Sequence, residues 1–417
     1  MADPARDDAY QPRDELFLWW LAEPAKPRLV GSLLLVDGRR SVALRYADGW
    51  LGAGFALSED LPLHPGLLLP AERGTAAGAV DDARPDRWGE RVIRRFERSV
   101  RLSLLEFLLF AGDDRYGALG VSLEADAYVP WSRTPMPALD SLAAMNEAVA
   151  RVLADQPVDE RQRRLLRPGV SLGGARPKSV VEIDGVPWLV KFSEGEDQDT
   201  ELIEHATLQL AARCGIDANP SRALAVGARH AVAVRRFDRA PGRRHHAQSA
   251  RVALKAAGED LGYPQLAQLL RRLAPPRAIA AQQAQLFRRM VFNMMIDNTD
   301  DHEKNHALLT GPAGAAGGLL LSPAFDIVPS LQGLGQQAMQ VGDHGAETSL
   351  DNALSQARAF GLTVDQARAI ARELAATIDG WPAHYAAAGV RGPDLEIMAQ
   401  YLGRGPAAEV RRDARVG

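Results

Sequence analysis

Cysteine is nearly absent from the 417 residues, because Cys214 is the only one. An intramolecular disulfide is therefore excluded, and the composition favours a reducing compartment such as the cytoplasm. Long hydrophobic runs are also missing, since no stretch reaches the roughly 18 apolar residues that a membrane-spanning helix needs. Residues 1–8 are acidic and polar, unlike a secretory signal. We therefore expect a soluble, cytoplasmic protein with no membrane partner.

The chain also lacks a strong excess of either charge. Lys and Arg number 49 and Asp and Glu number 53, for a net charge of −4, so no global attraction to polyanions is expected. Basic runs occur at 161–167, 243–246 and 411–415, but aromatic residues are only 6% of the chain and acidic residues are interspersed. We interpret these runs, and the pair His245 and His246, as solvated surface.

Hydrophobic residues make up 46% of the chain, enough for a large core and for two or three domains. Strands are predicted at 30–36 and 41–46, joined by Asp37-Gly38, a strong hairpin signal. Helices are predicted at 81–96 and 102–110, and three prolines within 130–137 favour a domain boundary. The domains we expect are 1–135, an N-terminal subdomain; 136–240, a nucleotide-binding lobe; and 241–417, a helical catalytic lobe. The predicted helices of the last domain are 264–273, 278–296, 350–359, 363–379 and 393–402.

Residues able to do chemistry concentrate in Ile296–Asn305, directly after an apolar stretch with helical spacing. A phosphoryl-transfer site needs a carboxylate that accepts the proton of the attacking hydroxyl, and Asn and Asp oxygens that hold Mg²⁺. Asp300 and Asn305 are five residues apart, as in the catalytic loop of protein kinases. Asp326 follows Phe325 and can supply the second metal ligand. His302 and Lys304 lie between the base and the asparagine.

Three weaker signals precede this loop in an order that supports the same interpretation. Residues 170–179 are rich in glycine, whose backbone N–H groups can approach an anion, and Lys178 adds a positive charge. Lys191 ends an apolar strand, where it can contact nucleotide phosphates. Glu204 on the following helix can pair with Lys191 and orient it. Each signal alone is more readily explained by a tight turn, an exposed lysine or a solvated glutamate.

Two other classes of function stay open. The first is a metal-dependent hydrolase, although its ligand spacing is unfavourable. Its residues would be Asp300, Asp301, His302, His306 and Asp326. The second is a catalytically silent, kinase-like corepressor. Incorporation of the γ-phosphate of ATP into protein would separate a kinase from the hydrolase, and failure to bind Mg-ATP would favour the corepressor.

Four segments together resemble the motifs of HipA-type serine/threonine kinases, the toxins of HipBA-like toxin–antitoxin modules. They are Ser171-Leu-Gly-Gly-Ala-Arg-Pro-Lys178, Val234-Arg-Arg-Phe-Asp-Arg239, Asn298-Thr-Asp-Asp-His-Glu-Lys-Asn305 and Pro323-Ala-Phe-Asp326. Residues 30–33, 61–63 and 112–119 are similar to the N-terminal subdomain of that family. The resemblance covers about residues 28–330, and the four motifs occur in the family's order.

This resemblance implies an α/β (α+β), two-lobed, protein-kinase-like fold with an N-terminal β-rich subdomain and a mainly helical C-terminal lobe. It implies that Asp300 is the catalytic base, that Asn305 and Asp326 hold Mg²⁺, and that Lys191 contacts ATP with Glu204 near it. The other ATP-binding residues it implies are Gly173, Gly174, Ala175, Arg176, Pro177 and Lys178 over the phosphates, Arg235, Arg236 and Phe237 at the adenine, and His302, Lys304 and Phe325.

The resemblance further implies that Ser171 is autophosphorylated, which inactivates family members by displacing the glycine loop. The implied substrate is a translation component such as an aminoacyl-tRNA synthetase. The implied partner is a HipB-like DNA-binding antitoxin, so DNA would be contacted only indirectly. Asp301 departs from the small residue that is familiar at its position, and we interpret it as a bystander.

Overall fold

The structure, a computed structural model, describes residues 10–132, 134–170, 174–310 and 318–416. The chain folds into two compact units, one formed by Met1–Leu189 with Asp238–Gln248 and the other by Val190–Phe237 with Ser249–Gly417. The main chain passes from one unit to the other at 189–190, 237–238 and 248–249. Within the described residues, no helix has both the length and the apolar character needed to cross a membrane.

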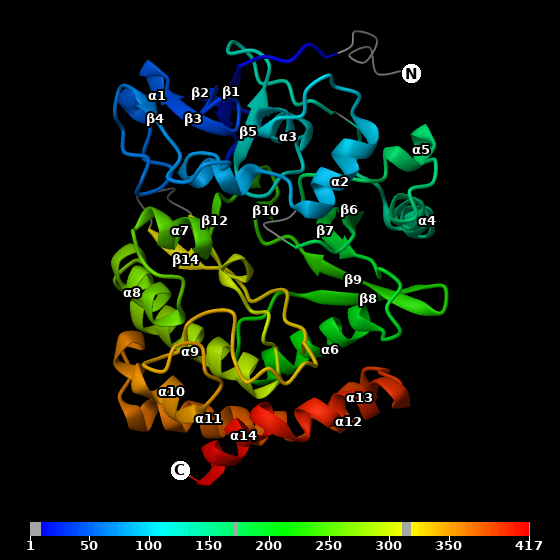
Figure 1. Cartoon of the computed structure of the whole chain (residues 1–417), viewed down its shortest axis with the longest axis vertical. Helices are drawn as coiled ribbons and strands as arrows, with labels where there is room; N and C mark the ends of the chain where they lie inside the picture. The colour runs from blue at the N-terminus through cyan, green and yellow to red at the C-terminus, as the bar shows by residue number, and fades with distance from the viewer. Residues whose placement is uncertain (1–9, 133, 171–173, 311–317, 417) are drawn as a thin grey trace. The chain divides into compact units, whose positions relative to one another are not determined.

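The first unit is built on a five-stranded antiparallel sheet with the order β4-β3-β2-β1-β5 (Figure 1). Its strands are β1 (Glu15–Trp20), β2 (Arg28–Val36), β3 (Ser41–Tyr46), β4 (Leu67–Leu68) and β5 (Leu119–Ser122). The helix α3 (Leu104–Phe110) packs on this sheet, and every residue of the helix is buried. The hydrophobic core of the unit lies between the sheet and α3. Leu16 and Leu18 of β1, for example, are fully buried in it.

The remaining elements of this unit lie between the strands of this sheet in the sequence, or come after its last strand. The helices are α1 (Asp48–Ala53), η1 (Gly78–Ala83), α2 (Arg87–Phe96), η2 (Leu139–Ser141), α4 (Leu142–Leu153) and α5 (Glu160–Arg163). The strands are β6 (Lys178–Ile183), β7 (Val186–Lys191), β10 (Arg239–Ala240), β11 (Arg243–Arg244) and β12 (Ala247–Ser249), of which β7 and β12 continue into the second unit. The helix predicted over 81–96 is interrupted, because Pro85 precedes Asp86, whose carboxylate caps α2 by accepting the Gly89 N–H at 2.8 Å.

The predicted Asp37-Gly38 turn is present, and a second Asp-Gly pair forms the turn between β6 and β7. Asp37 and Gly38, between β2 and β3, have φ values of 53° and 62°. Asp184 and Gly185, between β6 and β7, have φ values of 55° and 73°. The β6–β7 loop has two residues, and positive φ at both is the type I′ geometry that matches the twist of a hairpin. The β2–β3 loop has four residues, 37–40, and its Arg39 also has a positive φ of 69°.

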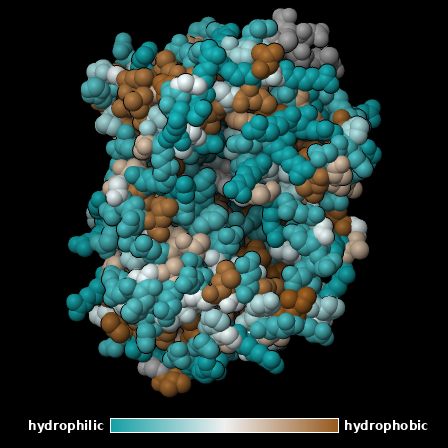
Figure 2. All heavy atoms as spheres, in the orientation of Figure 1, coloured by the Kyte–Doolittle hydropathy of each residue, from teal (hydrophilic) through white to brown (hydrophobic). Residues whose placement is uncertain are grey.

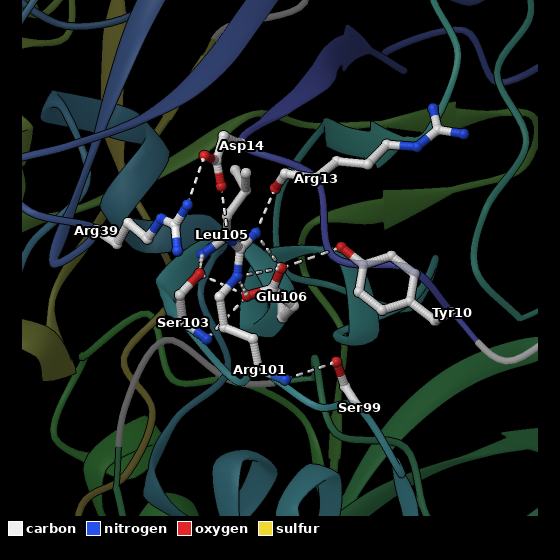
Figure 3. Close-up of polar contacts among 9 residues, drawn as sticks. All are labelled: Tyr10, Arg13, Asp14, Arg39, Ser99, Arg101, Ser103, Leu105 and Glu106. Atoms are coloured by element: carbon white, nitrogen blue, oxygen red, sulfur yellow. Dashed lines mark hydrogen bonds and ion pairs between the residues drawn. The ribbon is translucent and has the colours of Figure 1, made fainter.

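A buried carboxylate fastens the start of the described chain to α3 (Figure 3). The Glu106 side chain has no exposed surface, and its carboxylate lies 2.8 Å from Arg101 Nη2 and 3.1 Å from the Tyr10 hydroxyl. It also accepts the Ser103 backbone N–H at 2.8 Å, which completes the capping box of α3. Arg101 forms an ion pair with Asp14 as well. Burial raises the pKa of the Glu106 carboxyl, but the hydrogen bonds from Arg101 and Ser103 outweigh burial and leave that pKa below its usual value.

We expect Glu106→Gln to lower the free energy of unfolding by about 1–3 kcal/mol, because a neutral amide cannot satisfy the Arg101 guanidinium and the Ser103 N–H equally well. Urea denaturation of the purified variant measures this loss. The matched control is Glu124→Gln, which removes an ion pair with Arg13 whose two side chains are 61% and 46% exposed. That control should change stability by less than about 0.5 kcal/mol, and an equal effect of both substitutions would contradict the prediction.

The segment Asp238–Gln248 belongs to the first unit because polar contacts tie it to the turn that precedes β5. The Asp238 carboxylate accepts the Gly117 N–H at 2.8 Å, and Arg244 lies 2.7 Å from Asp113. His246 in this segment is buried edge-on against Trp20, with ring centroids 5.1 Å apart. Burial lowers the pKa of His246 to about 4. The expectation of a solvated His246 is therefore wrong, because the aromatic cluster around Trp20 encloses its ring.

The second unit is mainly helical. Its strands beyond β7 and β12 are β8 (Ser221–Val226) and β9 (Arg229–Arg235), an antiparallel pair, and β13 (Ala307–Thr310) and β14 (Leu319–Leu321), another antiparallel pair. Its helices are α6 (Thr200–Arg213), α7 (Ala250–Ala256), α8 (Tyr263–Leu273), α9 (Ile279–Met295), η3 (Glu303–Asn305), α10 (Leu350–Ser355), η5 (Ala357–Phe360), α11 (Val364–Ile378), α12 (Trp381–Ala387), α13 (Gly392–Leu402) and α14 (Gly405–Val416). The helix α9 lies at the centre of the core, since α8, α11 and α14 all pack on it (Figure 1).

The surface carries only scattered apolar residues on the face drawn in Figure 2. The most exposed large ones in the described part of the chain are Val100 and Val416, at 91% and 86%. Single exposed apolar residues of this kind are normal for folded proteins.

Candidate active site

The polar stretch after α9 folds into a loop that is held by hydrogen bonds to Asn293 of α9 and to Ser330. The Asn298 N–H donates to the Asn293 carbonyl at 2.9 Å, and the Asn298 amide donates to Asn293 Oδ1 at 3.1 Å. The N–H groups of Thr299 and Asp300 donate to the Ser330 hydroxyl at 2.9 and 3.3 Å. The backbone on either side of Thr299 is thus fixed before the predicted base is reached.

Asp300 and Asn305, the predicted base and metal ligand, lie on the same loop. The Asp300 side chain is exposed, whereas Asn305 is 7% exposed and its amide donates to the Asp300 carbonyl at 3.4 Å. The short helix η3 begins after His302, whose Nδ1 accepts the Lys304 N–H at 3.2 Å and whose carbonyl accepts the Asn305 N–H at 2.9 Å. The structure therefore places the four predicted residues of this loop close together, in η3 and just before it. They are Asp300, His302, Lys304 and Asn305.

Asp297, which received no role from the sequence, anchors the loop to a later segment. Its φ is 57°, and its carboxylate accepts the N–H groups of Gln332 and Gly333 at 3.0 and 3.1 Å. Burial raises the pKa of Asp297 above its usual value. The only sequence signal was an aspartate at the end of a helix, a residue type that tolerates positive φ.

Lys191 is buried between two carboxylates of the second unit. Its Nζ lies 2.8 Å from Glu204 Oε1 on α6 and forms a second ion pair with Asp326. The Lys191 side chain is 8% exposed and that of Glu204 is 2% exposed. Burial alone would lower the pKa of Lys191, but Asp326 and Glu204 outweigh burial and raise it above its usual value. The lysine therefore stays charged, and the expected contact between Lys191 and Glu204 is present.

Asp326 completes this group from the segment after β14. Its φ is 57°, and its side chain keeps 35% of its surface exposed. The preceding Phe325 ring lies 5.3 Å from the Phe237 ring, so the predicted metal motif and the predicted adenine segment meet. In that segment Arg236 is buried, whereas Arg235 is exposed at the end of β9.

Asp301 is the centre of a buried network and not a bystander. One oxygen of its carboxylate, Oδ2, accepts the Tyr263 hydroxyl, the Asn293 amide at 2.7 Å and His306 Nε2 at 2.9 Å. Asp301 and His306 are each 2% exposed, and Tyr263 is fully buried. Burial raises the pKa of Asp301, but His306 and the Tyr263 hydroxyl outweigh burial and leave that pKa below its usual value. This network joins α8, α9 and the loop.

The Asp301 network also bears on the hydrolase alternative, which needs both Asp301 and His306. The His306 Nε2 and the Asp301 Oδ2 already bond each other inside the core. Across the described ranges, no group of three or more His, Cys, Asp or Glu side chains has the arrangement of a metal site. By ligand type, the Asn305 amide and Asp326 carboxylate oxygens suit Mg²⁺, which prefers oxygen donors.

The glycine loop belongs to the first unit, and only part of it is described. Ser171 and Gly173 lie outside the described residues. Gly174 and Ala175 are exposed, Arg176 is half-buried and Pro177 is buried. Lys178 is 3% exposed, and its Nζ lies 2.6 Å from Asp86, the residue that caps α2. The Trp88 indole N–H donates to the Lys178 carbonyl at 2.8 Å, so the start of α2 holds the base of the loop at two points.

We expect Asp86→Asn to lower the free energy of unfolding by about 1–3 kcal/mol, because asparagine keeps an oxygen acceptor for Lys178 but loses the charge. Asparagine caps helices as well as aspartate, so the α2 cap is retained. Trypsin should then cleave faster after Lys178, and both changes can be measured on the purified variant. The control is Asp159→Asn, an N-cap on α5 without such an ion pair. Unchanged cleavage and stability in Asp86→Asn would contradict the prediction.

Family models identify the class of protein to which this chain belongs, and a solved structure shows the same fold. The chain matches the model of the HipA N-terminal domain over residues 25–122 and that of the HipA-like C-terminal domain over residues 170–381. A HipA chain in a complex of HipA, HipB and operator DNA from Shewanella oneidensis MR-1 is similar, with 18% identity and a TM-score of 0.66. The similarity covers 96% of this chain and 99% of that one.

The fold is therefore the predicted α/β, protein-kinase-like fold with a β-rich N-terminal subdomain and a mainly helical C-terminal lobe. The chain belongs to the HipA family, and the resemblance drawn from the four motifs is confirmed. The proinflammatory kinase CtkA of Helicobacter pylori is also similar, with 13% identity and a TM-score of 0.41, over 59% of this chain and 93% of that one. The predicted roles of individual site residues and the division into three domains stay predictions.

Proposed function

We propose that this protein is an ATP- and Mg²⁺-dependent serine/threonine kinase and the toxin of a toxin–antitoxin system. The observation that carries the proposal is Lys191, buried and held between Glu204 of α6 and Asp326. In protein kinases a strand lysine paired with a helix glutamate contacts the nucleotide phosphates, next to an aspartate that holds metal. Membership of the HipA family and the kinase-like fold support the same activity.

In the proposed reaction, Asp300 accepts the proton of the substrate hydroxyl as that oxygen bonds to the γ-phosphorus of ATP. The bond from this phosphorus to the β,γ-bridging oxygen breaks, and ADP leaves with its electron pair. Its exposed side chain is open to a protein substrate, and its backbone is fixed through Ser330. Lys191 presents a positive charge to the phosphates. Asn305 and Asp326 would hold Mg²⁺, which when bound neutralises the charge that develops on the transferred group. Positioning and neutralisation account for most of the catalysis in this class of reaction.

The remaining residues of the proposed nucleotide site form groups according to the part of ATP that each would contact. The phosphates would be covered by Gly173, Gly174, Ala175, Arg176, Pro177 and Lys178. The adenine would lie near Arg235, Arg236 and Phe237, with His302, Lys304 and Phe325 completing the site. Ser171 would be the autophosphorylated residue. The domains would be 1–135, 136–240 and 241–417.

The proposed partner is a HipB-like, DNA-binding antitoxin, because the similar Shewanella oneidensis HipA was solved together with HipB and operator DNA. DNA would be contacted indirectly, through that antitoxin. The proposed substrate is a translation component such as an aminoacyl-tRNA synthetase, and the proposed location is the cytoplasm.

Labelled ATP tests the proposal directly. The purified protein is incubated with γ-labelled ATP, Mg²⁺ and a cell lysate, and labelled proteins are identified by mass spectrometry. We expect the wild type to transfer label and Asp326→Asn to lose transfer. Asparagine is preferred to alanine here because it tolerates the positive φ of 57° at this position. Asp365→Asn, an exposed site on α11, is the control that should keep activity. Absence of both label transfer and Mg-ATP binding in the wild type would refute the proposal.

A further inference from the structure

The helices α12, α13 and α14 begin at Trp381, the last residue of the match to the HipA-like C-terminal domain. They are drawn in orange to red in Figure 1, and no motif in the sequence assigns them a role. Their packing partners are specific, because α12 packs on α6 and α14 packs on α9 and α11. The helix α6 carries Glu204, and α9 leads directly into the loop with Asp300.

The contact between α12 and α6 is a buried pair of hydroxyls. The Tyr385 hydroxyl lies 2.7 Å from Thr207 Oγ1, and Thr207 donates its own proton to the Ile203 carbonyl at 2.7 Å. Tyr385 is therefore the donor, and both side chains are fully buried. The neighbouring His384 donates from Nε2 to the Ala206 carbonyl at 2.7 Å. These bonds hold α6 within one turn after Glu204, so they fix the rotation of the helix that presents this carboxylate.

The contact between α14 and α9 is a buried guanidinium. Arg411, which is 4% exposed, donates to the carbonyl of Met295, the last residue of α9. It also donates to Leu402 and, at 3.2 Å, to Ala407 carbonyls, and its Nε lies 3.3 Å from Asp379. Carbonyls at a helix C-terminus lack partners within the helix and attract a cation. The interpretation of 411–415 as solvated surface is therefore wrong for Arg411, which fixes the point where the predicted catalytic loop begins.

We propose that these two contacts, which we call the C-terminal brace, hold two residues of the proposed active site, Glu204 and Asp300, in position. Tyr385 is a positioning residue for Glu204, acting through Thr207 of α6. Arg411 is a positioning residue for Asp300, acting through the end of α9. Because phosphoryl transfer depends on the alignment of the reacting groups, a small movement of either element lowers its rate. The inference rests on the proposed kinase function for its effect on rate, and its effect on local structure stands independently.

Two variants and one control test the brace. Tyr385→Phe removes only the hydroxyl, and Arg411→Gln removes the guanidinium. The control is Arg412→Gln on the next residue, whose side chain is 65% exposed. Each protein is examined by hydrogen exchange of its backbone amides, by its unfolding midpoint, and by kcat and KM for ATP in the labelled-phosphate assay.

We expect Tyr385→Phe to speed exchange in 203–210 and leave 297–305 unchanged, and Arg411→Gln to do the reverse. Each of these two variants should lower kcat about tenfold, which corresponds to an activation free energy about 1.4 kcal/mol higher. The change in KM should be much smaller, because the loss is one of alignment. Arg412→Gln should resemble the wild type. A fall in activity that only follows the folded fraction, or unchanged exchange in 203–210 for Tyr385→Phe, would overturn the proposal.

The same experiment separates this inference from the function on which it rests. If the wild type transfers no phosphate but Tyr385→Phe still loosens α6 alone, the kinase function fails and the brace stands. If the wild type is an active kinase and Tyr385→Phe keeps full kcat, the brace fails and the kinase function stands. Should Arg411→Gln not fold, Tyr385→Phe decides the outcome by itself.

Discussion

Replacing Asp300 by asparagine should lower the rate of phosphate transfer about 10²–10⁴-fold, the usual contribution of a general base. Asparagine has nearly the same shape as aspartate but cannot accept the hydroxyl proton. The backbone contacts that hold this residue remain, because Ser330 receives the Asp300 N–H and Asn305 donates to its carbonyl. The substitution should therefore remove the proposed proton acceptor and leave the loop in place.

The measurement is kcat and KM for ATP with the purified variant, together with its unfolding midpoint. Because Asp300 is exposed, the free energy of unfolding should change by less than about 0.5 kcal/mol. Binding of Mg-ATP should persist, since the predicted contacts to nucleotide and metal come from other residues. Retained autophosphorylation in Asp300→Asn would show that another group takes the proton, and a large loss of stability would show that Asp300 has a structural role.

Local structure and the family could be predicted from the sequence because each depends on short segments. An Asp-Gly turn such as Asp37-Gly38 is recognisable from two adjacent residues that accept positive φ. The helix α9 was predictable from an apolar run with helical spacing, and it is observed at Ile279–Met295. The resemblance to HipA-type kinases rests on contiguous motifs in a fixed order, so it required no knowledge of distant contacts.

Most of what fixes the candidate site could not be predicted, because the partners are far apart along the chain. Lys191 and Asp326 are separated by 135 residues, and Lys178 and Asp86 by 92. Charge patterns also misled, because a basic run usually indicates solvated surface. Arg411 departs from that rule, because its guanidinium bonds three backbone carbonyls and Asp379 in place of solvent water. The burial of such a charge depends on tertiary partners that no local pattern reveals.

Asp301 illustrates the same limit at the centre of the site. From the sequence, Asp300 and Asp301 are adjacent carboxylates with nothing to distinguish them except the kinase-like spacing. In the structure Asp300 is exposed and Asp301 is 2% exposed, because the chain turns between them. One side chain therefore lies at the surface, and the other joins α8, α9 and the loop. The pair allows activity and stability to be tested by substitutions one residue apart.

We expect Asp301→Ala to lower the free energy of unfolding by about 3–5 kcal/mol, the range for removing one member of a buried charged network. Without the carboxylate, the Tyr263 hydroxyl, the Asn293 amide and His306 Nε2 lose their shared acceptor inside the core. Denaturation by urea measures the loss, and Asp300→Ala, at the exposed neighbouring position, is the matched control. Equal stability of the two variants would contradict the assigned role of Asp301.

The acid stability of the protein provides a second measurement of the same network. The folded-state pKa of Asp301 lies below its usual value, since His306 and the Tyr263 hydroxyl outweigh burial. A lowered pKa means that the stabilisation from Asp301 is complete above the unfolded pKa of about 3.9 and is lost as pH falls toward the folded value. The wild type should therefore lose more stability below about pH 4 than Asp301→Ala does, because the variant has no carboxylate to protonate at this position. If both proteins show the same pH dependence, the carboxylate is not held charged by this network.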